Sequence, residues 1–157
     1  MKKIGLYAGS FDPPTKGHIE IVESGSRLLD QLFVGIGVNP DKKYRFSLQQ
    51  RMEMLKASLS HLKNVEVKEI KGLTVECAKN WGVNFLVRGM RNTKDAEREI
   101  ELAIANSTLY PNIQTIIVPA NMKIASISSS LVREVLDHGG DASRFVPEAV
   151  FKFLKTQ

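Results

Sequence analysis

Apolar residues in this chain occur in short continuous runs, separated by stretches in which they recur every three or four positions. The runs at 32–38 and 83–87 are almost entirely apolar, as expected for parallel strands that are covered on both faces. Five segments are rich in strand-forming residues and are predicted to be β-strands: Lys3–Ala8, Leu32–Val38, Val65–Ile70, Val83–Val87 and Gln114–Val118.

Helical periodicity fills the intervals between these runs. It predicts six helices. The first carries His18, Ile21, Val22, Gly25, Leu28 and Leu29 on its inner face, and the second opens with a capping box at Ser47 and Gln50 and runs to about Ser60. The third runs from Thr74 to Trp81 with Gly82 as C′ residue, and the fourth from Asp95 to Leu109. The fifth follows Ser128 and ends at Gly139 and Gly140, and the sixth has Pro147 as its first residue. The fourth helix is expected to bury Ala96, Ile100, Ala103, Ile104 and Ser107.

Strands and helices alternate, and every connection is long enough to be a crossover. Such chains form a parallel sheet with right-handed connections. We therefore expect an α/β fold: a single Rossmann-like domain over residues 1–157, with a five-stranded parallel sheet and helices on both faces. Ligands of such folds bind beyond the carboxyl ends of the strands. The functional residues are thus expected in the loops that follow the strands: 9–16, 39–46, 71–73, 88–94 and 119–127.

Composition narrows the class of protein. Of 157 residues, 43% are hydrophobic and 25% are charged, which excludes a disordered chain, a collagen-like repeat and a disulfide scaffold. The single cysteine, Cys77, belongs to no cysteine–histidine cluster that could bind zinc. No apolar run is as long as a membrane span, and the stretch after Met1 is too short for a signal peptide. A cytoplasmic chain without a membrane partner is expected.

The net charge of +5 identifies no partner by itself. Lys and Arg number 22 against 17 Asp and Glu, and the basic residues are spread along the chain rather than gathered in a run. Nucleic acid is a possible partner that this spread does not favour, and we expect none. An enzyme that handles polyphosphates fits this charge, and so does a solvated surface with no partner.

The loop after the first predicted strand carries the clearest candidate chemistry. It contains Gly9, Asp12, Gly17 and His18. His18 falls on the first turn of a helix, whose N-terminus offers unpaired N–H groups and a positive dipole end. The loop matches neither the dinucleotide-binding fingerprint nor the P-loop. Taken alone, a histidine on a buried helix face is more often structural, and Asp12 could simply cap a turn.

The loop after the fourth predicted strand adds Arg88 and Arg91. Two arginines at the ligand edge of a parallel sheet suit phosphate oxygens. The alternative is a surface salt bridge with Glu97 or Asp95. Glu99 lies one step from the apolar stripe of the next helix, so it either borders the cleft or faces water.

Three serines, Ser128–Ser130, stand at the start of a later helix and offer hydroxyl and amide groups as a second anion site. Lys42 and Lys43 could close the site from another side, or simply be solvated. No Ser-His-Asp or Cys-His set is evident, and neither is a nucleophile or a general base. This combination favours phosphoryl or nucleotidyl transfer, which depends on positioning and charge neutralisation.

These motifs together resemble a known family. The segment 9–18 resembles the (T/H)-x-G-H signature of the nucleotidyltransferase superfamily. With Arg88–Arg91 and Ile127–Ser130 at their spacing, the whole chain is similar to the bacterial phosphopantetheine adenylyltransferase family. The resemblance implies that ATP and 4′-phosphopantetheine give dephospho-coenzyme A and pyrophosphate, with Mg²⁺, by in-line attack without a covalent enzyme intermediate. It also implies a cytoplasmic homohexamer.

Individual roles are implied by the resemblance alone. His18 would stabilise the transition state, and Lys42 would reach the reacting phosphate. The residues implied to bind phosphopantetheine are Ser10, Lys42, Thr74 and Arg88. The residues implied to bind ATP are Ser10, Phe11, His18, Gly89, Met90, Arg91, Glu99, Ile124, Ala125, Ser126, Ile127, Ser128, Ser129 and Ser130.

Three positions depart from the family's usual residues: Ser10 replaces Thr, Met90 replaces Leu, and Ile124 replaces an aromatic residue. Only the last change removes a contact, since ring stacking is lost. One alternative is a sibling enzyme, such as a nicotinamide-nucleotide adenylyltransferase or a glycerol-phosphate cytidylyltransferase, although the Arg-Thr-x-Gly-Ile-Ser-Thr-Thr run usual in cytidylyltransferases is missing. The other is a non-catalytic nucleotide- or RNA-binding domain, against which the intact His18 and both arginines argue.

Overall fold

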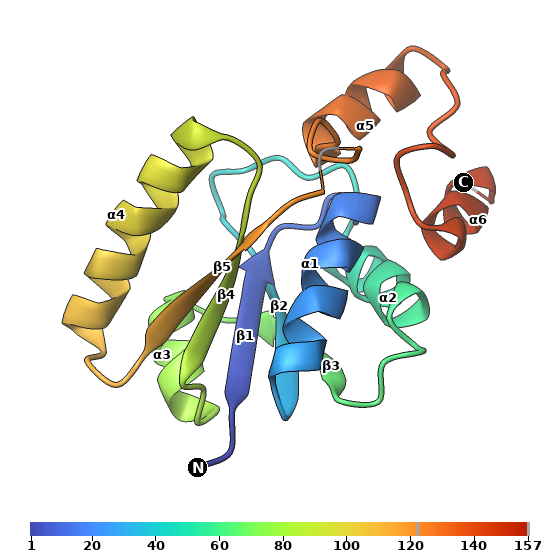
Figure 1. The fold of residues 1–157 in the computed structure, drawn as a ribbon. Helices are drawn as coiled ribbons and strands as arrows, with labels where there is room; N and C mark the ends of the chain where they lie inside the picture. The colour runs from blue at the N-terminus through green and yellow to red at the C-terminus, as the bar shows by residue number, and fades with distance from the viewer. Residues whose placement is uncertain (122, 157) are drawn as a thin grey trace.

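The structure is a computed structural model, and it describes residues 1–121 and 123–156. Five parallel strands form one sheet (Figure 1): β1 (Ile4–Gly9), β2 (Gln31–Gly37), β3 (Val65–Ile70), β4 (Phe85–Met90) and β5 (Gln114–Pro119). Their order across the sheet is β3-β2-β1-β4-β5. The expectation of a five-stranded parallel sheet is confirmed.

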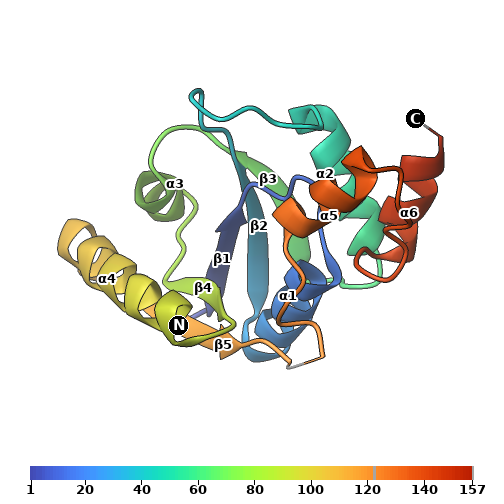
Figure 2. The ribbon, with the colours of Figure 1, turned by 90° about the horizontal axis from the view of Figure 1, so that it is seen from above.

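The described part of the chain contains six helices: α1 (Lys16–Leu28), α2 (Leu48–Ser58), α3 (Thr74–Asn80), α4 (Thr93–Leu109), α5 (Ser129–Asp137) and α6 (Glu148–Lys155). α1 and α2 cover one face of the sheet, and α3 and α4 cover the other (Figure 2). α6 packs beside α2, and α5 lies beyond the carboxyl ends of the strands (Figure 1). None of the described helices is both long enough and apolar enough to cross a membrane.

The core has two layers because successive strand residues point to opposite faces of the sheet. On β1, Leu6 packs with Phe33 and Leu86 in the layer beneath α3. Its neighbour Tyr7 packs with Ile21 in the layer beneath α1 and α2. Both faces of β1 are therefore buried, as the apolar runs predicted.

Capping residues explain where several helices begin. At the start of α2, Ser47 Oγ accepts the backbone N–H of Gln50, and the Gln50 side chain accepts the backbone N–H of Ser47. This is the predicted capping box. Ser128 is the N-cap of α5, and its side chain accepts the backbone N–H of Leu131. Pro147, expected as the first residue of the last helix, is instead its N-cap, so α6 begins one residue later.

Two other expectations are corrected at the ends of elements. β4 runs from Phe85 to Met90, so Arg88 belongs to the strand and not to the loop that follows it. Leu28, expected on the buried face of α1, is exposed as the last residue of the helix, while Leu29 turns inward. The exit from α1 turns the chain, so helical periodicity no longer holds there.

The predicted buried stripe of α4 is wrong. Ala96 and Ala103 are half-buried, and the remaining three residues are exposed: Ile100 at 52%, Ile104 at 62%, and Ser107. The buried residue of α4 is Glu99, at 8% exposure. Glu99 is paired with Arg88 from β4. An ion pair, rather than the large apolar side chains, therefore faces the sheet.

The strand order reverses between β1 and β4, and this reversal places the site. After β1 the chain turns to one face to form α1, and after β4 it turns to the opposite face to form α4 (Figure 2). The two connections diverge and leave a crevice beyond the carboxyl ends of both strands. Tyr7 pairs with Val87 in the ladder, so the ends of the two strands lie side by side at this crevice.

Candidate active site

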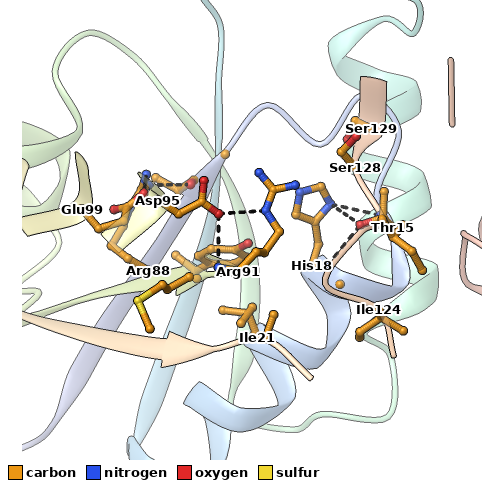
Figure 3. Close-up of a pocket in the computed structure, with 18 of the residues that line it drawn as sticks. Thr15, His18, Ile21, Arg88, Arg91, Asp95, Glu99, Ile124, Ser128 and Ser129 are labelled. Atoms are coloured by element: carbon orange, nitrogen blue, oxygen red, sulfur yellow. Dashed lines mark hydrogen bonds and ion pairs between the residues drawn. The ribbon is translucent and has the colours of Figure 1, made fainter. Parts of the chain in front are cut away.

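A cavity of about 360 Å³ opens at this crevice. Its walls come from β1, the start of α1, the end of β4, the first turns of α4 and the segment before α5 (Figure 3). Ten of the predicted site residues line it: His18, Arg88, Gly89, Met90, Arg91, Glu99, Ile124, Ile127, Ser128 and Ser129. Tyr7 and Thr15 also line the cavity, and sequence reasoning singled out neither.

The other predicted site residues are not part of the cavity wall: Ser10, Phe11, Lys42, Thr74, Ala125, Ser126 and Ser130. Thr74 begins α3 on the opposite face of the sheet from α1, and it is half-buried. Ser10 and Lys42 meet each other at a second position, beyond the end of β1. The structure thus gathers most of the predicted residues into two neighbouring groups, and Thr74 belongs to neither.

His18 is held in one orientation by the helix that it helps to cap. It is the third residue of α1, and Thr15 is the N-cap. The backbone N–H of Thr15 donates to His18 Nδ1 at 3.0 Å, and the backbone N–H of His18 donates to Thr15 Oγ1 at 3.3 Å. Because Nδ1 accepts from an amide, a neutral ring carries its proton on Nε2. The start of α1 therefore presents an N–H donor toward the cavity (Figure 3).

The surroundings of His18 keep its ring neutral. Burial, and after it the positive charge of Arg91, lowers the pKa of His18 from 6.5 to about 4. The ring is partly exposed through the cavity, but Phe11 packs edge-on behind it, with ring centroids 4.9 Å apart. Tyr7 packs edge-on against Phe11, with ring centroids 5.5 Å apart, and its burial raises the pKa of its hydroxyl to about 12. At neutral pH, His18 is a neutral hydrogen-bond donor and Tyr7 is un-ionised.

Phe11 supports His18 from beneath. Its side chain is buried, and its backbone φ is 50°, a left-handed conformation that is rare for an aromatic residue. Its ring lies so close to Gly9 that a Cβ there would come within 2.9 Å of it. The absence of a side chain at Gly9 therefore makes room for the ring that supports His18.

Arg88 is fixed by Glu99 of α4. Its Nε and Nη2 donate to the two carboxylate oxygens at 2.6 and 2.9 Å, and its Nη1 donates to the carbonyl of Ala8 at 3.2 Å. Burial acts to lower the pKa of Arg88, but its hydrogen bond to Glu99 and the charge of that carboxylate outweigh burial, so the pKa is raised. Sequence reasoning missed this pair and considered Glu97 and Asp95 as partners instead.

Arg91 is fixed less tightly, by Asp95 in the first turn of α4. Oδ2 of Asp95 accepts the side-chain Nε–H of Arg91 at 3.0 Å and its backbone N–H at 3.2 Å. The predicted alternative of an Asp95 ion pair is therefore confirmed for this arginine. Among the described residues, the two terminal nitrogens of Arg91 have no hydrogen-bond partner, and the side chain extends toward His18 (Figure 3). These N–H groups are available to an anion in the cavity.

The three serines at the start of α5 have protein partners of their own. Ser128 Oγ caps the helix, Ser129 Oγ donates to the carbonyl of Pro13 at 2.8 Å, and Ser130 Oγ accepts from Arg133 at 3.2 Å. The Ser129 hydroxyl therefore fastens α5 to the first loop, while the other two hydroxyls bond to groups of α5 itself. The amide of Leu131 is taken by Ser128, so the groups left for an anion are the backbone amides of Ser129 and Ser130, which have no hydrogen-bond partner among the described residues.

Ser10 and Lys42 form the second group. Nζ of Lys42 donates to Ser10 Oγ at 3.3 Å, so the second loop closes on the first, as the sequence suggested. Asp12 makes this closure possible, because its buried carboxylate accepts the backbone N–H groups of Arg45 and Phe46, both at 2.9 Å. An ammonium group beside a hydroxyl suits the oxygens of a phosphate.

Asp12 joins its own loop to the second loop and to α5, a role that sequence reasoning missed. Asp12 also contacts α5: Nη1 of Arg133 donates to the backbone carbonyl of Asp12 at 2.7 Å and lies 3.8 Å from the Asp12 carboxylate. These partners stand 33 to 121 residues away along the chain. The only local signal was a carboxylate beside a proline in a loop bounded by glycines, which is also typical of an ordinary turn.

The carboxylates of the site are already engaged: Asp12 by backbone amides, Glu99 by Arg88, and Asp95 by Arg91. In the part of the chain that the structure describes, no group of three or more His, Cys, Asp or Glu residues could hold a metal ion. The described residues therefore offer no carboxylate and histidine cluster of their own for Mg²⁺. An ion of this kind fits here as a companion of a bound polyphosphate, whose oxygens it prefers.

This arrangement is suited to stabilising negative charge. A neutral N–H donor and a guanidinium face one cavity, with helix amides nearby and an ammonium–hydroxyl pair beside it. Among the described residues that line the cavity, no serine or cysteine is hydrogen-bonded to a histidine, and Cys77 is buried in α3. The chemistry that remains is transfer of a phosphorus-centred group by positioning and electrostatics.

Comparison with known proteins places the chain in a class. The model of the cytidylyltransferase-like family matches residues 6–135, and the chain belongs to this family of nucleotidyltransferases. A solved structure of a bifunctional NMN adenylyltransferase/ADP-ribose pyrophosphatase from Francisella tularensis, complexed with AMP and a manganese ion, superposes with a TM-score of 0.74. It is 18% identical and covers 99% of this chain and 49% of that chain. This likeness concerns the fold.

More similar relatives identify the branch of the class. The phosphopantetheine adenylyltransferase of Heliobacterium modesticaldum is 40% identical over 147 residues, which are 94% of this chain and 88% of the relative. That of Thermosynechococcus vestitus is 41% identical over 152 residues, which are 97% and 90% of the two chains. The chain belongs to the phosphopantetheine adenylyltransferase family. The resemblance drawn from the motifs is confirmed.

Proposed function

We propose that this enzyme transfers the adenylyl group of ATP to 4′-phosphopantetheine, giving dephospho-coenzyme A and pyrophosphate, a step of coenzyme A biosynthesis. One observation carries the proposal. The neutral Nε2–H of His18 and the guanidinium of Arg91 face the same cavity, in a chain about 40% identical to relatives named for this reaction. Sibling reactions on other phosphate substrates are not favoured by these relatives.

The reaction is an in-line displacement at the α-phosphorus of ATP. An oxygen of the acceptor phosphate bonds to this phosphorus while the bond to the oxygen bridging the α- and β-phosphates breaks. Pyrophosphate leaves with that oxygen, and no covalent enzyme intermediate forms. Negative charge grows on the α-phosphoryl oxygens that do not bridge. His18 donates to one of them, and because Thr15 already fixes its ring, it does so without rearrangement.

The two groups of residues divide the substrates between them. Arg91 and the first-turn amides of α5 hold the phosphates of ATP, while Met90 borders its nucleoside. Ser10 and Lys42 hold the phosphate of the acceptor, and Lys42 neutralises charge on the reacting oxygens. Arg88, anchored by its carboxylate partner, presents positive charge to the acceptor. Each role requires a group that the protein fixes before the ligand arrives.

Some of the predicted contacts take a narrower form in this proposal. Phe11 reaches ATP through its backbone, because its ring is buried beneath His18. Thr74, on the far face of the sheet, contacts the part of phosphopantetheine remote from its phosphate. The segment 124–127 borders the nucleotide through its backbone and through Ile124 and Ile127, which line the cavity.

Mg²⁺ enters this proposal as part of the ATP substrate. The described residues offer it no cage, so the phosphate oxygens of ATP and water hold it. When bound it neutralises phosphate charge. No step of the reaction is assigned to it beyond that.

One assay tests the function. Pyrophosphate release from ATP is measured with 4′-phosphopantetheine, with nicotinamide mononucleotide and with glycerol phosphate, each at saturation. We expect turnover with phosphopantetheine only. Equal or faster release with nicotinamide mononucleotide would contradict the proposal, and binding of ATP without any release would favour a non-catalytic nucleotide binder.

We also propose that the protein assembles as a homohexamer in the cytoplasm. The number six comes from the resemblance to the family. Support for assembly comes from α4, whose Ile100 and Ile104 are exposed in the single chain. The two residues are one turn apart on α4, and adjoining exposed apolar side chains form the kind of patch that marks an interaction surface. The buried free thiol of Cys77 agrees with a reducing compartment.

Light scattering tests the assembly. We expect a mass near six times the 17.5 kDa of one chain. The double variant I100D/I104D should lower it, because two carboxylates cannot be buried unpaired. The matched control is L28D, which changes an exposed leucine on α1. A monomeric wild type at micromolar concentration would contradict the proposal, and so would equal dissociation of the control.

A further inference from the structure

The loop that carries Lys42 is fastened to α2 by a contact between an aromatic ring and a cation. The ring centroid of Tyr44 lies 4.1 Å from the guanidinium carbon of Arg51. At the other end of the ring, the Tyr44 hydroxyl accepts the backbone N–H of Asn39 at 2.8 Å. Asn39 and Tyr44 stand on either side of Lys42 in the chain. The backbone on both sides of Lys42 is therefore tied to one ring.

Arg51 is an unusual partner because it is buried, with 1% of its surface exposed. Its Nη1 donates to the carbonyl of Ser10 at 2.7 Å and points also to that of Gly37 at 3.5 Å. Within the described residues its Nε has no hydrogen-bond partner, and no carboxylate lies within ion-pair distance of its charge. Burying a cation without a paired carboxylate is costly. Backbone carbonyls, the negative charge of Asp12 beyond ion-pair distance and the face of Tyr44 are what the fold provides in return.

Both groups of the acceptor site therefore depend on one guanidinium. Ser10 is held through its carbonyl, and Lys42 is held through Tyr44, two residues further along the chain. Nζ of Lys42 lies 3.3 Å from Ser10 Oγ and 5.7 Å from the centroid of the Tyr44 ring. A lysine has a long flexible side chain, so its ammonium group is well placed only if its backbone is fixed.

We propose that Arg51 and Tyr44 are positioning residues for the acceptor phosphate, holding Lys42 and Ser10 at the spacing that the phosphate oxygens require. This inference rests on the proposed function, because the acceptor is the phosphate of phosphopantetheine. Neither residue touches the phosphate. The fixed charge of Arg51 behind the site adds positive potential where the anion binds.

Two substitutions of Tyr44 separate the ring from the hydroxyl. Tyr44→Leu removes both, whereas Tyr44→Phe keeps the ring on Arg51 and loses only the bond to Asn39. We expect Tyr44→Leu to raise the KM for phosphopantetheine on the order of tenfold, with the KM for ATP changed less than about twofold. Tyr44→Phe should recover most of this loss. The matched control is Tyr110→Leu, at the C-cap of α4 and remote from Lys42.

A double-mutant cycle tests whether Tyr44 acts through Lys42. In a Lys42→Ala background the ammonium group is already gone, so Tyr44→Leu should then change the KM for phosphopantetheine less than about twofold. A full tenfold effect in that background would overturn the proposal. So would a Tyr44→Leu protein that melts at a lower temperature but keeps both KM values, because that is the result of a structural role alone.

Hydrogen exchange of the free protein tests the positioning role without measuring enzyme activity, so its outcome does not depend on the proposed function. Tyr44→Leu should speed exchange of the Asn39 amide and of residues 40–44, without affecting residues 88–91. Unchanged exchange at Asn39 would overturn the inference even if the enzyme is active. If Tyr44→Leu speeds exchange as expected but the wild type releases no pyrophosphate with phosphopantetheine, the result would instead contradict the proposed function. It would also overturn the assignment of the acceptor, since Arg51 and Tyr44 would then fasten a loop without positioning that phosphate.

Discussion

α1 and α4 both present their third residue to the cavity, and in both this residue accepts a backbone N–H, but the two helix starts fix different groups. In α1 this residue is His18, whose ring accepts the backbone N–H of the N-cap, Thr15. In α4 it is Asp95, whose carboxylate accepts two N–H groups of Arg91, the residue before the N-cap Asn92. One helix start fixes a neutral donor, and the other fixes a cation. Capping hydrogen bonds thus set the geometry of the site before any ligand binds.

The bodies of the two helices differ as well. α1 packs on the sheet with the apolar face that its sequence predicted, through Ile21 and Val22. α4 turns Glu99 toward the sheet and leaves Ile100 and Ile104 exposed. The comparison teaches that an apolar stripe decides a helix's orientation only where no buried ion pair competes for the same interface.

The largest effect is expected from His18→Ala. It should lower kcat on the order of 10²–10³-fold, because its hydrogen bond strengthens as charge grows on the α-phosphoryl oxygens. The KM for ATP should change much less. His18→Gln retains one N–H donor and should recover part of the loss. Steady-state kinetics with circular dichroism as a check of folding decide the matter, and a folded His18→Ala variant with near-normal kcat would make His18 a structural residue.

The neutrality of His18 gives a prediction on pH. The protein has three histidines, and NMR titration should find one that stays neutral well below pH 6, with a pKa near 4. This signal should vanish in His18→Gln. The unfolded chain takes up a proton at His18 as the pH falls through about 6.5, whereas the folded protein does so only near 4. The wild type should therefore lose stability in this interval, and His18→Gln should lose less. Three histidines that all titrate near 6.5 would contradict this.

A smaller effect is expected on the α4 side, from Arg91→Ala. It should raise the KM for ATP about tenfold to a hundredfold, because each hydrogen bond to a charged group is worth about 1.5–3 kcal/mol. The value of kcat should fall less, since the phosphates are charged in both the ground state and the transition state. Arg27→Ala, an exposed arginine at the end of α1, is the control and should leave the KM unchanged. A loss confined to kcat would show that Arg91 acts in the transition state instead.

The smallest effect is expected from Asp95→Asn. The amide keeps the size of the side chain and one acceptor oxygen, but it no longer holds Arg91 by charge. We expect the KM for ATP to rise a few-fold, with kcat nearly unchanged, because an exposed ion pair contributes about 0.2–1 kcal/mol. The two changes at Arg91 and Asp95 should not be additive. Additive effects would mean that Asp95 acts on the ligand directly and not through Arg91.

Much of the fold could be predicted from the sequence. The alternation of apolar runs and helical stretches predicted the parallel sheet, because strands covered on both faces leave a continuous apolar signal. Local capping signals predicted the starts of α2 and α5, because Ser47 and Ser128 bond to amides within three residues. The motifs around His18, Arg88 and Arg91 also predicted the loops that meet at the cavity.

What the sequence determined by itself was therefore the set of interactions between neighbours in the chain: strands, caps, and the placing of His18 on a helix start. Only the tertiary structure decided three other contacts: the burial of Glu99 of α4 against Arg88, the joining of loops by Asp12, and the packing of Arg51 on the ring of Tyr44. These contacts join charged groups to partners on other elements. A charged residue reads as solvent-exposed in a sequence unless its partner is known, and the partner is supplied by the fold.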